Sequence, residues 1–181
     1  MKVEETILKG CFIIQPKVIQ DKRGYFLESF NKAEFKKGIK QEINFVQDNE
    51  SNSSKGVLRG LHYQEGEFAQ AKLVRVIKGK VLDVVVDLRN ESPTFSQHMS
   101  IELSEENKTQ LFIPRGFAHG FLVLSDTAIF SYKCDNFYNK ESEGGIIFSD
   151  KTLGIDWMLP NNELIISEKD IILPELDKAI L

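Results

Sequence analysis

In the stretch Val81–Asp87 (VLDVVVD), one face of the expected strand carries only aliphatic side chains, whereas Asp83 and Asp87 interrupt the aliphatic run on the other face. A strand of this kind fits a sheet that is packed in a core on one side and lines a cavity on the other. The alternative is that both aspartates face water. The alternation alone does not choose between the two.

Similar short runs recur along the chain, separated by turn-forming residues. Helix signals are few: Asn31 suits the start of a helix that Gly38 would end, and a second helix is expected to begin at Ser167. Regular strands with little helix indicate an all-β sandwich, jelly roll or barrel. We expect loops or hairpins between the strands, for example at 51–56, and strands at 43–49, 57–63, 71–77, 81–88, 99–103, 109–114, 121–124 and 128–134.

The composition indicates a protein of ordinary globular type. A chain of 181 residues with 41% hydrophobic residues is of single-domain size, so we expect one domain over 1–181. The net charge of −4 provides no overall attraction for nucleic acid or anionic lipid, and no apolar run is long enough to span a membrane. The two cysteines, Cys11 and Cys134, are expected to be reduced, buried thiols in a cytoplasmic protein.

The segment 55–64 carries an arginine, a glycine and a histidine within an apolar run. Arg59 and His62 are three residues apart, so regular alternation would send their side chains to opposite faces. A β-bulge at Gly60 would bring both to one side, as is common beside active sites. The alternative is an edge strand with an exposed arginine and a core histidine.

In the segment 113–121, a proline and two glycines lead to His119 at the start of a strand. This pattern resembles the second half of the cupin signature. The first half of that signature normally supplies two more histidines and a glutamate, but here only His62 and Gln64 stand in the matching region. Since a transition metal needs three or four ligands, the pattern favours a cupin barrel without a metal site. His98 is expected at the surface.

Other polar residues have both a structural and a functional interpretation. Tyr132 is either a core tyrosine or a proton donor opposite a base. The turn 21–24 carries two cations, and Phe26 shares a face with Glu28 in the strand that follows. The amides of Gln47 and Asn49 share a face and suit the hydrogen-bonding edge of a pyrimidine. Taken singly, the turn residues and the two amides are better explained as polar side chains exposed to water, and Tyr132 as a core tyrosine.

Together these segments closely resemble the dTDP-4-dehydrorhamnose 3,5-epimerase family of the cupin superfamily. The likeness extends in order along nearly the whole chain, to about Asp170. It implies a double-stranded β-helix, the cupin jelly roll, with a few short helices. The matching stretches are 21–29, 45–49, 56–64, 72–76, 84–89, 92–95, 113–121 and 132–134.

The resemblance also implies the reaction and its partners. Members convert dTDP-4-dehydro-6-deoxy-D-glucose to dTDP-4-dehydro-L-rhamnose by moving protons at C3 and C5, without a cofactor. They are homodimers that exchange amino-terminal strands, so residues of the first strands, such as Arg23 and Glu28, are expected to serve the partner's site.

Residue roles follow by the same resemblance. His62 matches the general base, Tyr132 the acid that returns a proton on the opposite face, and Asp170 the carboxylate that orients the histidine. Lys72 and Arg59 are implied to lie near the keto oxygen and the diphosphate. The ring expected to stack on the nucleobase is that of Tyr138. The remaining matches to substrate-contacting positions are Arg23, Phe26, Glu28, Gln47, Asp48, Asn49, His119, Glu143 and Lys169.

Elementary chemistry agrees with these roles. A proton beside a ketone is removed only where the developing enolate is stabilised by a nearby cation, and inversion needs a base and an acid on opposite faces. One histidine, one tyrosine and one lysine meet this need. Three alternatives remain: an epimerase that inverts one carbon only, a non-catalytic sugar-nucleotide-binding cupin, and a metal-dependent cupin oxygenase.

Overall fold

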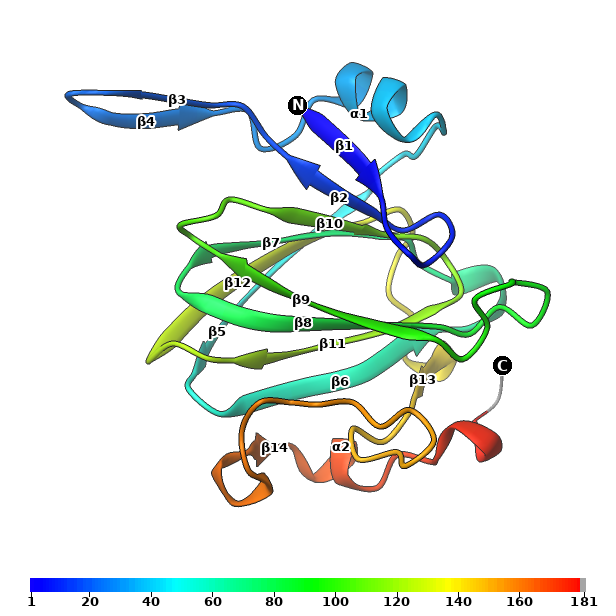
Figure 1. Ribbon diagram of the computed structural model, residues 1–181. Coiled ribbons are helices and arrows are strands. Elements are labelled where there is room, and N and C mark those ends of the chain that lie inside the picture. The colour runs from blue at the N-terminus through cyan, green and yellow to red at the C-terminus, as the bar shows by residue number, and fades with distance from the viewer. Residues whose placement is uncertain (180–181) are drawn as a thin grey trace.

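Two sheets, one above the other, form the body of the molecule in the computed structural model, which describes residues 1–179 (Figure 1). The first sheet has the order β1 (Lys2–Glu5), β2 (Phe12–Gln15), β10 (Gln110–Ile113), β7 (Lys72–Lys78), β12 (Thr127–Cys134) and β5 (Gln47–Ser54). The second has the order β13 (Glu143–Gly145), β6 (Val57–Gln64), β11 (Phe117–Val123), β8 (Lys80–Asp87) and β9 (His98–Ser104), with β14 (Ile165–Ile166) beside β6. The expected all-β jelly roll is confirmed.

The remaining elements are short. β3 (Val18–Asp21) and β4 (Gly24–Leu27) form a separate two-stranded hairpin. The two α-helices of the described residues are α1 (Lys32–Ile39) and α2 (Glu168–Ile171). Single 3₁₀ turns lie at Gly66–Phe68, Lys140–Ser142, Asn161–Glu163 and Leu176–Lys178. No helix within residues 1–179 has the length and apolar character needed to cross a membrane.

Both faces of β8 are buried, which decides a point that the alternation of Val81–Asp87 left open. Val81 and Val85 pack between the two sheets, with side chains from β7, β10, β11 and β12. Val84 and its neighbours on the opposite face are covered by the carboxyl-terminal segment, which contributes Trp157 and Leu176. Each fully buried aliphatic side chain contributes roughly 1.5–3 kcal/mol. The carboxyl-terminal segment is therefore held against the outside of the second sheet.

Neither aspartate of this strand faces water, because Asp83 and Asp87 are both fully buried. Asp87 accepts hydrogen bonds from Arg89, Ser92 and Thr94, each at 2.6 Å from its Oδ2. It therefore fixes the loop that leaves β8. Asp83 contacts His119 of β11, so both aspartates are buried polar groups and neither one lines a cavity itself.

The expected start of α1 is confirmed and its expected end at Gly38 is wrong. The Asn31 side chain accepts hydrogen bonds from the N–H groups of Ala33 and Glu34. The helix continues through Gly38 to Ile39, and the left-handed conformation falls on Lys40. A Cβ atom at Gly38 would lie 2.5 Å from the side chain of Val3, so this glycine permits close packing on β1 rather than ending the helix.

The strand expected at 43–49 is displaced. β5 begins at Gln47 and continues to Ser54, so the loop expected at 51–56 is mostly strand. β5 lies at the edge of its sheet, where it pairs with β12 along its whole length. Ile43 and Phe45 instead pack beside Phe35 of α1. The strand expected at 121–124 also begins earlier than expected, at Phe117.

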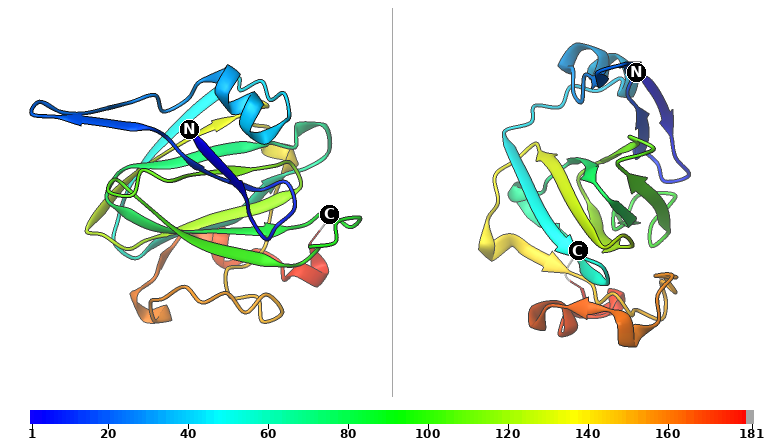
Figure 2. Two further views of the ribbon diagram at one scale, coloured as in Figure 1. Left: turned by 45° about the horizontal axis from the view of Figure 1, so that its top comes forward. Right: turned by 90° about the vertical axis from the view of Figure 1, so that its left-hand side faces the viewer.

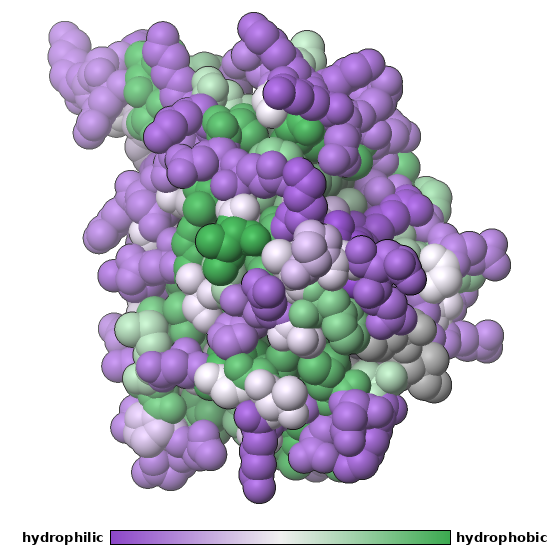
Figure 3. Space-filling view, turned by 45° about the vertical axis from the view of Figure 1, so that its right-hand side comes forward, coloured by the Kyte–Doolittle hydropathy of each residue, from purple (hydrophilic) through white to green (hydrophobic). Residues whose placement is uncertain are grey.

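The β3–β4 hairpin projects from the body, away from both sheets (Figures 1 and 2). Its Ile19, Tyr25 and Phe26 side chains are more than half exposed. The tip is hydrophilic (Figure 3, upper left). An isolated two-stranded hairpin is of marginal stability on its own.

We expect Asp87 to make stability fall at acid pH. Burial alone would raise its pKa, but hydrogen bonds from Arg89, Ser92 and Thr94 outweigh burial and lower the pKa to about 2. A lowered pKa in the folded state adds stability above the unfolded pKa, and this is lost as pH falls through the folded pKa. Wild type should lose about 2 kcal/mol relative to Asp87→Asn between about pH 5 and pH 2. Urea unfolding at a series of pH values measures this, and parallel pH curves for the two proteins would contradict it.

Candidate active site

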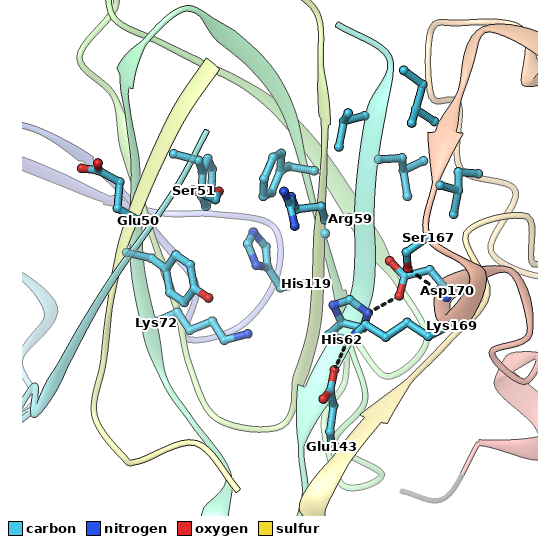
Figure 4. A pocket seen from close by; sticks show the side chains of 18 of the residues that line it. Glu50, Ser51, Arg59, His62, Lys72, His119, Glu143, Ser167, Lys169 and Asp170 are labelled. Carbon is cyan, nitrogen blue, oxygen red and sulfur yellow. Dashed lines mark hydrogen bonds and ion pairs between the residues drawn. The ribbon is translucent and has the colours of Figure 1, made fainter. Parts of the chain in front are cut away.

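Both sheets contribute side chains to a cavity of about 610 Å³, here called the main cavity (Figure 4). Its volume is in the range typical of small-molecule sites. Lys72 and Tyr132 come from the first sheet, and Arg59, His62 and His119 from the second. Tyr138, Glu143, Lys169 and Asp170 complete the set of predicted site residues that line it.

A β-bulge at Gly60 brings Arg59 and His62 to the same cavity, as predicted. Across the β6–β11 pair, His62 is opposite His119 and Arg59 is opposite Phe121, so three steps on β6 face two on β11. Gly60 has a φ of +119°, which favours glycine, and a Cβ atom there would lie 2.7 Å from the Cα of Gly120. The bulge therefore depends on glycine at both positions.

His62 is held by a buried carboxylate. Its Nε2 lies 2.8 Å from Oδ1 of Asp170, and the other oxygen of Asp170 accepts the Gly60 N–H at 3.3 Å. Ser167 caps α2 and so fixes the backbone of Asp170, as its predicted role at the helix start requires. Burial would raise the pKa of Asp170, but the hydrogen bond and charge of His62 outweigh it and lower that pKa. An ionised Asp170 orients the ring and leaves Nδ1 for a ligand.

On the opposite wall, Tyr132 and Lys72 belong to neighbouring strands of the first sheet. Burial raises the pKa of the Tyr132 phenol, so the hydroxyl stays protonated and can donate. The Lys72 amine lies 5.9 Å from the centre of the Tyr132 ring, and burial lowers its pKa. A histidine held by a carboxylate and a protonated tyrosine therefore face each other across the cavity, with a lysine beside the tyrosine.

Hydrogen bonds join the residues at the rim. Glu143 accepts hydrogen bonds from the Tyr138 hydroxyl at 2.6 Å and from Lys169 at 2.8 Å. Gln47 accepts the backbone N–H of Tyr138 and donates to Asn49. The predicted amide pair is therefore next to the predicted stacking ring, although neither amide lines the main cavity itself.

Four predicted site residues lie elsewhere. Asp48 forms an ion pair with Lys133 at 2.9 Å and lines a separate depression, because it alternates with Gln47 and Asn49 along β5. Arg23 is exposed at the hairpin tip and pairs with Asp21 of its own chain. Phe26 and Glu28 line a smaller cavity near the amino terminus.

One buried group at the site was not predicted. Asp83 lies 2.9 Å from Nε2 of His119, whose ring stacks on Phe130. The only signal in the sequence was a carboxylate on an aliphatic face. Within residues 1–179 the structure holds no group of three or more His, Cys, Asp or Glu side chains suited to a metal ion.

Comparison with known proteins gives one consistent family. Residues 5–178 match the family model described as dTDP-4-dehydrorhamnose 3,5-epimerase. The epimerase of that name from Shigella flexneri is 53% identical over 171 residues, covering 94% of this chain and 93% of the relative.

Solved structures agree. A dTDP-4-dehydrorhamnose 3,5-epimerase from Elizabethkingia anophelis has a TM-score of 0.95 and 56% identity, with 99% of each chain covered. A dTDP-6-deoxy-D-glucose-3,5-epimerase from Legionella pneumophila, solved with dTDP-4-keto-L-rhamnose, has a TM-score of 0.94 and 47% identity, covering 98% of this chain and 93% of the other.

We expect Gly60→Ala to unfold at lower temperature than wild type and to distort the cavity. The added methyl group meets the backbone of β11, and overpacking of this kind costs about 1–3 kcal/mol beyond the strain of a positive φ. Gly24→Ala is the matched control, because Gly24 has a φ of +122° and nothing within 4 Å of its added Cβ. Thermal unfolding of both variants measures the difference. Equal shifts would show that the close approach to Gly120 contributes nothing.

Proposed function

The chain belongs to the dTDP-4-dehydrorhamnose 3,5-epimerase family, and we propose that it converts dTDP-4-dehydro-6-deoxy-D-glucose to dTDP-4-dehydro-L-rhamnose. The observation that carries this proposal is the placement of His62 and Tyr132 on opposite walls of one cavity. Inversion at carbon requires removal of a proton from one face and its return from the other.

His62 is the base in this proposal. Asp170 holds the ring through Nε2, so Nδ1 is free to take the proton, and the ionised carboxylate stabilises the imidazolium that forms. C3 and C5 both adjoin the C4 ketone, so the same base and the same enolate-stabilising group serve both carbons in turn.

Lys72 stabilises the enolate and Tyr132 returns the proton. Removal of either proton places negative charge on the C4 oxygen, and an ammonium group in a dry cavity stabilises that charge strongly. The Tyr132 hydroxyl is protonated because burial raises its pKa. Each proton removed is replaced by another, so the reaction is redox-neutral and we propose that no cofactor takes part.

The rim suits the nucleotide. Arg59 can bind phosphate oxygens with its guanidinium, and its hydrogen bonds to Ser53 hold it at the cavity wall. Tyr138 offers an exposed ring for stacking on thymine. We assign Gln47 and Asn49 to the hydrogen-bonding edge of the base.

We further propose a single-domain homodimer in which the β3–β4 hairpin lies against the partner. The hairpin exposes Ile19, Tyr25 and Phe26 and makes few contacts with its own body, which supports an intermolecular partner. In that arrangement Arg23, Phe26 and Glu28 complete the partner's site. Cys11 and Cys134 are free, buried thiols, which supports a cytoplasmic location for the protein.

We expect solvent deuterium to enter C3 and C5 of the substrate with wild type and with His98→Ala, a control for loss of a histidine outside the cavity. His62→Ala should lose exchange at both carbons by about 100-fold or more. Tyr132→Phe should keep exchange but retain the original configuration, because the enolate is reprotonated from the His62 side. Mass and NMR analysis of recovered sugar nucleotide measures both. Exchange at one carbon only would indicate a single-site epimerase, and binding without exchange a non-catalytic protein.

The exchanged hairpin predicts complementation between two inactive variants. In a mixed dimer of His62→Ala and Arg23→Ala, one site combines intact His62 with intact Arg23 from the partner. We therefore expect partial recovery of activity after the two proteins are co-refolded, and a dimeric mass by light scattering. Inactivity of the mixture despite dimer formation would show that Arg23 acts on its own chain.

A further inference from the structure

Asp83 is a buried carboxylate to which the reaction as described above gives no role. It is fully buried on β8, on the face that carries Val81 and Val85 into the core between the sheets. Its Oδ2 lies 2.9 Å from Nε2 of His119, a residue that lines the main cavity. The carboxylate therefore contacts the main cavity only through His119 and does not line the cavity itself.

Its second oxygen has no partner. Oδ1 of Asp83 is the one buried side-chain oxygen or nitrogen within residues 1–179 that lacks a hydrogen bond. Within the described residues, Asp83 forms a single ion pair, and its partner is His119. Leaving a charged oxygen buried and unpaired is costly, so the Asp83–His119 pair is favoured without net charge. Burial raises the pKa of Asp83 and acts in the same direction, because it outweighs the opposite effect of His119 and of the Lys72 charge.

A neutral pair fixes where the protons are. If Asp83 is protonated, it donates to Nε2 and the neutral ring carries its proton on Nδ1. If the proton has passed to the ring, both nitrogens carry protons and Asp83 is ionised. Nδ1–H is present in both cases. It is absent when the pair carries a net negative charge, or when the proton lies on Oδ1 of Asp83, and Oδ1 has no hydrogen-bond partner that would hold a proton there.

The second histidine pair of the cavity shows the contrast. His62 and His119 are directly opposite each other on β6 and β11, and each ring binds a carboxylate through Nε2. Asp170 also receives the Gly60 N–H, whereas Asp83 receives no further hydrogen bond. Two donors favour the ionised form of Asp170, which suits a carboxylate that supports a base. Asp83 has one partner only, and this favours a pair with His119 that keeps one more proton than the Asp170–His62 pair.

We propose that Asp83 is a positioning residue that holds His119 with its Nδ1–H as a hydrogen-bond donor in the main cavity. Resting on the proposed function, this donor acts with Lys72 on the C4 oxygen of the substrate as the enolate forms. Figure 4 shows His119 and Lys72 both directed into the cavity. Two donors at one oxygen stabilise its developing charge more than the lysine alone.

The first test needs no substrate. Protein labelled with ¹⁵N-histidine has three histidines, and His119→Asn assigns the His119 signals by their loss. At about pH 7 we expect Nδ1 of His119 to be protonated in the free protein. An unprotonated Nδ1 would overturn the proposal, whatever the protein's activity.

The second test is a double-mutant cycle on turnover of the keto-sugar nucleotide. We expect Asp83→Leu to lower kcat by about 10- to 100-fold while the Kd for dTDP changes less than about twofold. His119→Asn should lose less, because its amide N–H can occupy the place of Nδ1–H. Adding Asp83→Leu to His119→Asn should then cost less than about twofold. Full multiplication of the two losses would mean that Asp83 acts through the fold and not through His119.

Two controls keep the outcomes separate. Asp87→Asn removes another fully buried carboxylate from the same face of β8, and it should lower stability while leaving kcat unchanged. If Asp83→Leu does not fold, the same cycle and criterion apply to Asp83→Asn. If wild type fails to epimerise the substrate, the proposed function falls, and the ¹⁵N measurement on the free protein still decides the state of His119.

Discussion

The close approach of β6 and β11 at Gly60 and Gly120 is the contact on which the geometry of the main cavity depends. Without side chains at these positions, the two backbones come near enough for β6 to bulge. The bulge turns Arg59 and His62 to the same side and leaves the Gly60 N–H facing Asp170. One local backbone feature thereby places a cation and a histidine in the cavity and supplies a hydrogen bond to the carboxylate that holds the histidine.

The side chains that line the main cavity come from both sheets of the jelly roll. The two histidines that contact carboxylates, His62 and His119, come from the second sheet, whereas Lys72 and Tyr132 come from the first. The two sheets pack through a continuous apolar core, so their separation is set by core side chains such as Phe130 and Phe121, whose rings stack at 4.2 Å. Packing of the core therefore controls the distance between His62 and Tyr132.

Much of the fold was predictable because it rests on local patterns. The alternation in Val81–Asp87, the cap at Asn31 and the glycine at the bulge each carry their cause within a few residues. β5 was misplaced because its serines and asparagines are typical of loops, yet an edge strand needs one neighbour and tolerates polar side chains. The family resemblance also assigned Asp48 to the substrate beside Gln47 and Asn49, although strict alternation sends its side chain to the other face of β5.

Local sequence patterns could not predict which carboxylate pairs with which histidine. Asp83 meets His119 across 36 positions, and Asp170 meets His62 across 108. Family resemblance supplied the second pair and not the first, and no periodicity distinguishes a carboxylate that receives one hydrogen bond from one that receives two. That difference arises because the folded chain directs the Gly60 N–H to Asp170, whereas no second donor reaches Asp83. The surroundings of each histidine are thus a property of the folded backbone, because the carboxylates that the two rings contact receive different numbers of hydrogen bonds.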